Sequence, residues 1–142
     1  MKTFFDTNVL VYLFDAGQPA KQKRARELLD EEVRAGRALF STQVLQEFYV
    51  AVTRKLATPL DPESAYRAVV DFSALPLVQV DRPLILSSIL RCRRDTVSFW
   101  DALVVQAAIA GRANVLYSED LQDGREFETV RIRNPFAEVP VS

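Results

Sequence analysis

Short apolar segments alternate with longer amphipathic segments along the whole of the 142-residue chain. The short segments are typical of buried strands, and the longer ones repeat apolar residues every three or four positions, as helices do when they cover a core. This alternation predicts an α/β fold with a parallel sheet flanked by helices on both faces, in a single domain over residues 1–142. The expected strands are 1–5, 38–41, 77–80, 114–117 and 130–132, and the expected helices run from Asn8, over 20–34, over 42–56, from Asp61, over 81–94 and over 99–110.

Polar residues and glycine mark several of the expected helix ends. Thr42 is expected to cap the helix that follows strand 38–41, and Asp61 to cap the next helix. Gly111 is expected to end helix 99–110. The stretch 123–126 has the composition of a surface loop.

The composition excludes several kinds of chemistry. The chain has no histidine, which removes Ser-His-Asp and Cys-His catalysis, and its one cysteine cannot supply the ligands of common zinc sites. If the chain is an enzyme, carboxylates are therefore the expected chemical groups. A net charge of −1 requires any basic binding surface to be local. No apolar run approaches the roughly 18 residues of a membrane span, so a cytoplasmic protein is expected.

Two acids follow predicted strands. Asp6 comes directly after strand 1–5, and Asp120 lies three residues beyond Tyr117, the last residue of a strand. Because the carboxyl ends of parallel strands lie on one edge of a sheet, we expect these carboxylates to converge there. Simpler roles stay open: Asp6 or Asn8 can cap a helix, and 118–120 can form a turn.

Two more acids interrupt apolar helices. Asp101 lies in helix 99–110, which is apolar nearly all round, and a lone buried carboxylate is costly unless it is paired or binds a metal. Glu47 also has mainly apolar helical neighbours. Each has a simpler explanation: Ser98 and Asp101 fit a capping box, and Glu47 can pair with Arg54.

Converging carboxylates repel one another and raise one another's pKa. A hard divalent cation removes this conflict, and an all-oxygen site favours Mg²⁺ or Mn²⁺ over zinc. Such a cation can activate water and stabilise the charge of a displaced phosphate oxygen. In a chain without histidine, metal-bound water would be the natural nucleophile at such a site.

The chain resembles the PIN domain, and more closely the VapC toxins of bacterial and archaeal toxin–antitoxin pairs. The resemblance covers essentially the whole chain and rests on four features in order: FDTNVL at 5–10, Glu47, FWDAL at 99–103 and LYSEDL at 116–121. It implies a parallel sheet of order 3-2-1-4-5 and an endoribonuclease that depends on Mg²⁺ or Mn²⁺. The catalytic set that it implies is Asp6, Glu47, Asp101 and Asp120, with Asp6, Asp101 and Asp120 as metal ligands.

The resemblance also implies supporting residues and partners. Thr7, Asn8 and Ser118 match positions that organise such a site, whereas Asp123 is left outside the core set. The implied partners are an RNA substrate, a small antitoxin protein whose C-terminal segment lies beside the active site, and a second copy of the chain in a homodimer.

A physical reason for a dimer is sought in exposed apolar surface. The helices 8–14 and 20–34, together with Tyr49 and Tyr66, are expected to offer more apolar and aromatic surface than a small monomer buries. Eight of the chain's 18 basic residues could position phosphates, although solvated faces explain most such residues better. They are Lys21, Lys23, Arg24, Arg91, Arg93, Arg94, Arg131 and Arg133.

Two other functions compete with the ribonuclease. The first is a noncatalytic interaction module on the same fold, which metal-dependent RNA cleavage would exclude. The second is a phosphatase of the haloacid dehalogenase type, which also places acids after its first strand. That family needs Asp-x-Asp there, and this chain has Asp6-Thr7-Asn8.

Overall fold

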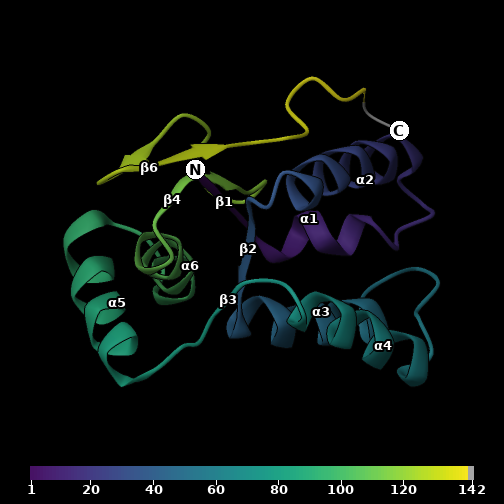
Figure 1. The fold of residues 1–142 in the computed structure, drawn as a ribbon, viewed down its shortest axis with the longest axis horizontal. Helices are drawn as coiled ribbons and strands as arrows, with labels where there is room; N and C mark the ends of the chain where they lie inside the picture. Colours follow the sequence, from purple (N-terminus) through teal and green to yellow (C-terminus); the bar gives the residue numbers. More distant parts are fainter. Residues whose placement is uncertain (141–142) are drawn as a thin grey trace.

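A six-stranded sheet forms the centre of the computed structural model, which describes residues 1–140 (Figure 1). Its first half runs β1 (Lys2–Phe5), α1 (Thr7–Tyr12), α2 (Pro19–Arg34), β2 (Ala38–Ser41), α3 (Thr42–Arg54) and α4 (Pro62–Ser73). Its second half runs β3 (Leu77–Val78), α5 (Arg82–Asp95), α6 (Phe99–Ala110), β4 (Ala113–Tyr117), β5 (Glu126–Phe127) and β6 (Val130–Arg133).

The strand order is β3-β2-β1-β4-β6-β5. The neighbours from β3 to β6 pair in parallel, and these five strands are the five predicted from the sequence, in the predicted order. The sequence does not predict the sixth strand, β5, because the stretch 123–126 has the composition of a surface loop. It is a two-residue strand that pairs antiparallel with β6 through a tight turn, in which Glu128 has a φ of 54°. A two-residue strand is too short for its side-chain alternation to be recognised.

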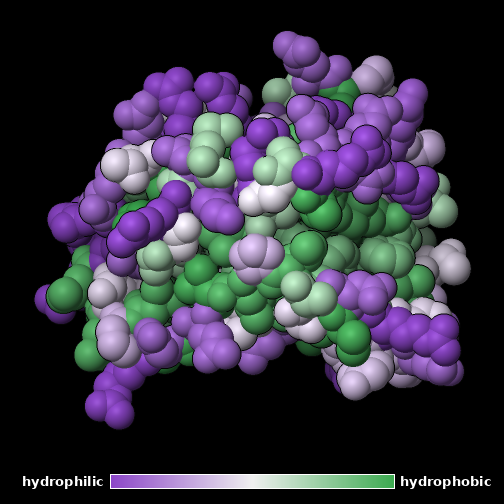
Figure 2. All heavy atoms as spheres, viewed as in Figure 1, coloured by the Kyte–Doolittle hydropathy of each residue, from purple (hydrophilic) through white to green (hydrophobic). Residues whose placement is uncertain are grey.

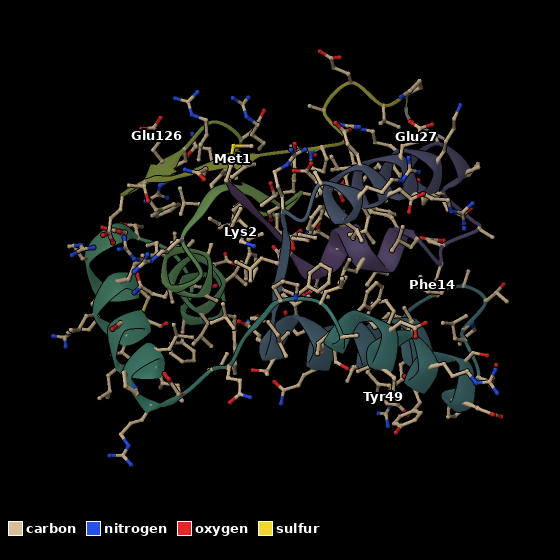
Figure 3. The ribbon with its side chains drawn as sticks, viewed as in Figure 1. Met1, Lys2, Phe14, Glu27, Tyr49 and Glu126 are labelled. Carbon is tan, nitrogen blue, oxygen red and sulfur yellow. The ribbon has the colours of Figure 1, made fainter. Side chains whose placement is uncertain are left out.

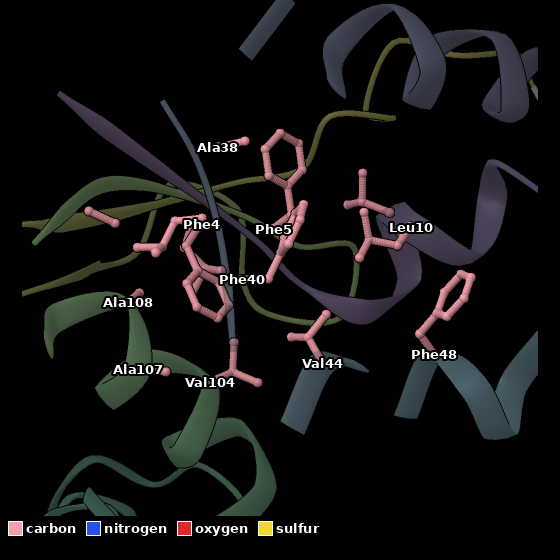
Figure 4. Close-up of a cluster of buried hydrophobic side chains, with 14 of the residues drawn as sticks. Phe4, Phe5, Leu10, Ala38, Phe40, Val44, Phe48, Val104, Ala107 and Ala108 are labelled. Atoms are coloured by element: carbon pink, nitrogen blue, oxygen red, sulfur yellow. The ribbon is translucent and has the colours of Figure 1, made fainter. Parts of the chain in front are cut away.

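Helices cover both sides of the sheet. In Figure 1, α5 and α6 lie on one side of β1 and β2, and α1 to α4 lie on the other. Buried side chains from β1, β2, α1, α3 and α6 meet in the core (Figure 4). Aromatic rings continue this core outward along α3 and α4, where Phe48 stands edge-on to Phe72 and to Phe14. This packing fixes the helices that frame the carboxyl edge of the sheet.

Several helix boundaries differ from the predictions by one or two residues, and two of the differences have a clear local reason. The cap of α3 is Ser41, whose hydroxyl accepts from the Val44 amide at 3.3 Å. Thr42 is instead the first helical residue, and its hydroxyl accepts from the Val80 amide at 3.0 Å. The first helix ends at Tyr12, so the predicted extension to residue 14 was too long. Apolar sequence alone did not reveal this end, because the turn that follows is also apolar.

Gly111 ends α6, as predicted, but the reason is space rather than backbone freedom. Its φ is −80°, which every residue can adopt. A Cβ at this position would lie 2.3 Å from Leu39 Cδ2 and 3.0 Å from Val78 Cγ2. The absence of a side chain therefore lets the end of α6 approach β2 and β3 closely.

Exposed apolar side chains lie on other helices than the sequence predicted. In α1, Val9 and Leu10 are buried, and α2 exposes only one large apolar side chain among the described residues, that of Val33. Tyr49 and Tyr66 are exposed as predicted, and Tyr49 points outward from α3 (Figure 3). Further exposed apolar side chains are Val50, Val70, Ile85, Leu86, Ile89 and Leu90, on α3, α4 and α5.

Hydrophobic residues gather across the middle of the face shown in Figure 2, between hydrophilic residues above and below. No helix within residues 1–140 is long and apolar enough to cross a membrane.

Candidate active site

β1 and β4 end at the same level of the sheet. Phe5 pairs with Tyr117 in the parallel register, and the Asp6 amide donates to the Tyr117 carbonyl at 2.9 Å. The residues that follow the two strands, Asp6 and Ser118, are therefore neighbours, and the Ser118 hydroxyl donates to Asp6 Oδ2 at 2.7 Å. The structure thus brings together the two strand ends that the sequence placed on one edge.

A cavity of about 640 Å³ opens at this edge. All four predicted acids line it, and they come from four places in the chain: the β1–α1 junction, α3, α6 and the segment after β4. Of the predicted supporting residues, Thr7 and Asn8 line the cavity as well, whereas Ser118 is fully buried beneath Asp6. Asp123 does not line the cavity, and its carboxylate accepts from the Asn134 amide.

Asp6 is the buried acid of the set, with only 6% of its surface exposed. Its pKa is raised to about 6: burial is the main cause and repulsion from Asp120 and Glu47 adds to it, while bonds from the Ser118 hydroxyl and the Thr7 amide oppose the rise. The Thr7 bond also makes Asp6 the cap of α1. The predicted capping role is therefore real, but it occupies one oxygen of a carboxylate that also borders the cavity.

The start of α1 holds two of the other acids. The Thr7 hydroxyl donates to Glu47 Oε1 at 2.9 Å, and Asn8 Nδ2 donates to Asp120 Oδ2 at 3.0 Å. Within the described part of the chain, Glu47 forms no ion pair with Arg54. The neutral donors Thr7 and Asn8 orient these carboxylates without neutralising their charge.

Asp101 is held by its backbone rather than by its side chain. The Ser98 hydroxyl accepts from the Asp101 amide at 3.0 Å, which is the first half of the predicted capping box. The second half is absent, because the Asp101 carboxylate has no hydrogen-bond partner among residues 1–140. A half-buried carboxylate that lines the cavity without a partner is available to a ligand.

Several cavity residues were not predicted. Asp15 adds a fifth acid, and Lys55 is the one basic side chain among the lining residues of the described chain. Gln43 and Trp100 meet at one wall, where Gln43 Nε2 donates to the Trp100 carbonyl at 3.2 Å. For Trp100 the sequence did hold a signal, since it is the chain's only tryptophan and directly precedes Asp101.

Most of the basic residues considered for phosphate binding have acidic partners. Lys21 pairs with Glu119 at 2.7 Å, beside the Tyr12 hydroxyl, which donates to the same carboxylate. Arg91 is buried and pairs with Asp95 at 2.6 Å. Ion pairs also involve Lys23, Arg94 and Arg131. None of the eight residues lines the cavity, which agrees with a structural role for most of them.

The cavity suits a divalent cation in its chemistry. Five acidic side chains and one basic side chain line it, and every acidic ligand offers oxygen, the donor that Mg²⁺ and Mn²⁺ prefer. No three acids within residues 1–140 are close enough, as placed, to form a ready-made metal site. Glu47 and Asp120 are exposed and turned toward Thr7 and Asn8, so a cation would have to draw them inward. The donor set therefore fits a hard cation, and closure requires side-chain rotation.

A parallel sheet with acids gathered at its carboxyl edge and no imidazole defines a class of carboxylate-lined α/β proteins. The chain belongs to the PIN domain family, because the family model of the PIN domain matches residues 3–128. A comparison with curated proteins found no match.

Solved structures show the same fold. VapC20 of Mycobacterium tuberculosis, described as a sarcin–ricin loop cleaving toxin, has a TM-score of 0.69 at 19% identity, over 84% of this chain and 90% of that one. A toxin–antitoxin complex from Klebsiella pneumoniae has a TM-score of 0.68 at 18% identity, over 94% and 98%. DNA-bound VapBC from Salmonella typhimurium has a TM-score of 0.63 at 22% identity, over 95% and 98%.

Proposed function

We propose that the protein is a metal-dependent endoribonuclease and the toxin of a toxin–antitoxin pair of the VapBC type. The observation that carries this proposal is the convergence of Asp6, Glu47, Asp101 and Asp120 on one cavity in a chain without histidine. The similar folds described as a loop-cleaving toxin and as toxin–antitoxin complexes support it. The residues that line the cavity come from positions 6 to 120, and we propose that residues 1–142 form one catalytic domain.

Some of the site residues would bind the cation, and others hold the ligand side chains in position. Asp6, Asp101 and Asp120 would bind Mg²⁺ or Mn²⁺, and Glu47 completes the acidic set. When bound, the cation supplies charge stabilisation and an activated water for phosphodiester hydrolysis. Ser118 holds one Asp6 oxygen, while Thr7 and Asn8 orient Glu47 and Asp120. Burial keeps bulk water away from Asp6, which strengthens its interaction with any bound cation.

The two competing functions have less support than the ribonuclease. Membership of the PIN family removes the haloacid dehalogenase alternative. A noncatalytic interaction module would need the fold and the helix caps but has no use for the unpartnered Asp101 carboxylate. The acids themselves therefore favour catalysis.

Cleavage of RNA by purified protein tests the proposal. We expect defined RNA fragments in the presence of Mg²⁺ or Mn²⁺ and none in EDTA, because the acids need a cation to accept a phosphate. Sequencing the fragment ends would identify the cleavage site. If folded protein leaves RNA intact with both metals, the noncatalytic module becomes the better explanation.

A small antitoxin and a second copy of the chain are the proposed protein partners, in the cytoplasm. The exposed apolar side chains on α3, α4 and α5, such as Tyr66 (65% exposed) and Leu90 (63%), offer surface for such contacts. A basic side chain of the antitoxin would pair with the cavity acids and compete with the metal.

Co-expression with the neighbouring gene tests the partners. We expect a stable complex, a particle mass by light scattering that corresponds to at least two copies, and growth arrest when the chain is expressed alone. A monomer that binds no neighbouring gene product and leaves growth unchanged would contradict this proposal.

A further inference from the structure

Trp100 is exposed to an unusual degree for its type. It is the second residue of α6, and 62% of its surface is accessible although tryptophan is among the largest apolar side chains. It lines the acidic cavity and directly precedes Asp101. An aromatic face at the rim of a site is a surface on which a ligand can stack.

The indole is carried by a fixed segment of backbone. Ser98 caps α6 at its first turn, and the Trp100 carbonyl accepts a hydrogen bond from Gln43 of α3. The Phe99 ring stands 5.2 Å away, at 68° to the indole. A platform held in this way loses little conformational freedom when a ligand stacks on it.

Gln43 provides a second, independent sign of a ligand. Its side chain is 95% buried by surface area and lines the same cavity, and its Oε1 is the one buried side-chain polar atom without a hydrogen-bond partner in residues 1–140. A buried unpaired carbonyl oxygen costs free energy until a donor reaches it. Nucleotides carry such donors in their exocyclic amino groups and ribose hydroxyls.

The charge of the cavity also favours a base over a phosphate at this wall. Lys55 alone opposes five lining acids, so electrostatic attraction contributes little to holding RNA here. The lining of the cavity also includes Val50, Val104 and Leu56, which suit the apolar face of a base. Stacking can supply affinity that the charges do not.

We propose that Trp100 and Gln43 form a nucleobase subsite beside the catalytic acids. The indole stacks on a base of single-stranded RNA next to the cleaved bond. Gln43 Oε1, which is buried in the free protein, accepts a hydrogen bond from the same nucleotide once the Gln43 side chain shifts toward it. Bases inside a duplex are stacked and paired, so the subsite selects unpaired RNA. This inference rests on the proposed ribonuclease function and specifies part of its substrate recognition.

Intrinsic fluorescence tests stacking without any need for catalysis. Trp100 is the only tryptophan, so all indole emission reports on this one side chain. We expect a short single-stranded RNA, added in EDTA, to quench the emission saturably, whereas the same RNA in a duplex does not. Saturable quenching without cleavage would support the subsite even if the nuclease function fails. Normal cleavage without quenching would overturn the subsite and leave the nuclease function standing.

Variants test the contribution to cleavage. We expect Trp100→Ala to raise KM for single-stranded RNA by about 5- to 100-fold, the range that base stacking gives, with a smaller change in kcat and partial rescue in Trp100→Phe. Val33→Ala is the control and should leave KM unchanged, because Val33 is an exposed apolar side chain of α2 that lies outside both the cavity and the surface proposed for protein partners. Gln43→Met should bind RNA roughly 5-fold more weakly. An unchanged KM in Trp100→Ala would overturn the proposal. So would Trp100 emission that changes when a protein partner is added but not when single-stranded RNA is added.

Discussion

Asp101→Asn should cut RNA at least about 100-fold more slowly than the parent protein, with Mg²⁺ supplied, since loss of one charge-stabilising group costs roughly 10²- to 10³-fold in other hydrolases. The substitution keeps the shape of the side chain. It also leaves the helix cap intact, because the cap bond is made by the Asp101 amide and the Ser98 hydroxyl. A loss of rate therefore measures the charge. Single-turnover cleavage of an end-labelled RNA gives the rate directly.

Two control variants separate catalysis from stability. Asp123→Asn removes an acid that lies outside the cavity, and an asparagine oxygen can still accept from the Asn134 amide, so full activity is expected. Ser98→Ala removes the cap of α6 and should lower the free energy of unfolding by about 1 kcal/mol while leaving the folded enzyme active. If Asp101→Asn cuts as fast as Asp123→Asn, the catalytic site has been placed wrongly.

The parts of the site that follow from topology could be predicted from the sequence. Asp6 and Asp120 were placed together because parallel strands bring their carboxyl ends to one edge, and the Phe5–Tyr117 register shows that arrangement. Asp101 and Glu47 were found as acids in apolar helices. Their assignment to one site came from the resemblance to the PIN domain, because helix 99–110 is apolar nearly all round and its periodicity does not define a single inward face.

The remaining cavity residues depend on packing between distant elements. Gln43 looks like an ordinary polar residue in its helix, and only the approach of α6 shows that its amide meets the Trp100 carbonyl. Lys55 follows the end of α3 and could equally have faced solvent. Exposed apolar surface was expected on the wrong helices for the same reason: an apolar helical face such as that of α1 is identifiable from sequence, but the element that covers it is not.

Asp6 links the stability of the protein to pH and to metal. Its pKa is about 6 in the folded protein and 3.8 as the ordinary value, so the folded state holds the proton more tightly than the unfolded state. Between about pH 4 and pH 6 the unfolded chain ionises first, and stability is therefore lost as the pH rises through this window. The pKa difference corresponds to at most about 3 kcal/mol. Above pH 6 the metal-free protein carries the full cost of a buried charge.

Asp6→Asn should remove that cost in the absence of metal. The uncharged amide can keep both contacts: its oxygen takes the place of Oδ1 and accepts from the Thr7 amide, while its Nδ2 takes the place of Oδ2 and donates to the Ser118 hydroxyl oxygen. In EDTA at pH 7.5 we expect the variant to unfold at a higher temperature than the parent, by about 2 to 4 °C for each kcal/mol recovered. At pH 4 the two proteins should melt at nearly the same temperature, because Asp6 of the parent is then neutral.

Addition of Mn²⁺ should reverse the order of the two proteins at pH 7.5. A cation that binds only the folded state adds about 2.7 kcal/mol when its concentration reaches 100 times Kd, and the ionised Asp6 of the parent is the ligand that it needs. The parent should therefore gain stability and Asp6→Asn should gain much less. Differential scanning calorimetry of both proteins, in EDTA and in millimolar-range Mn²⁺, measures all four states. Equal stabilisation of both by Mn²⁺ would place the cation away from Asp6, and a metal-free parent whose melting temperature does not fall between pH 4 and pH 7 would show that Asp6 ionises without penalty.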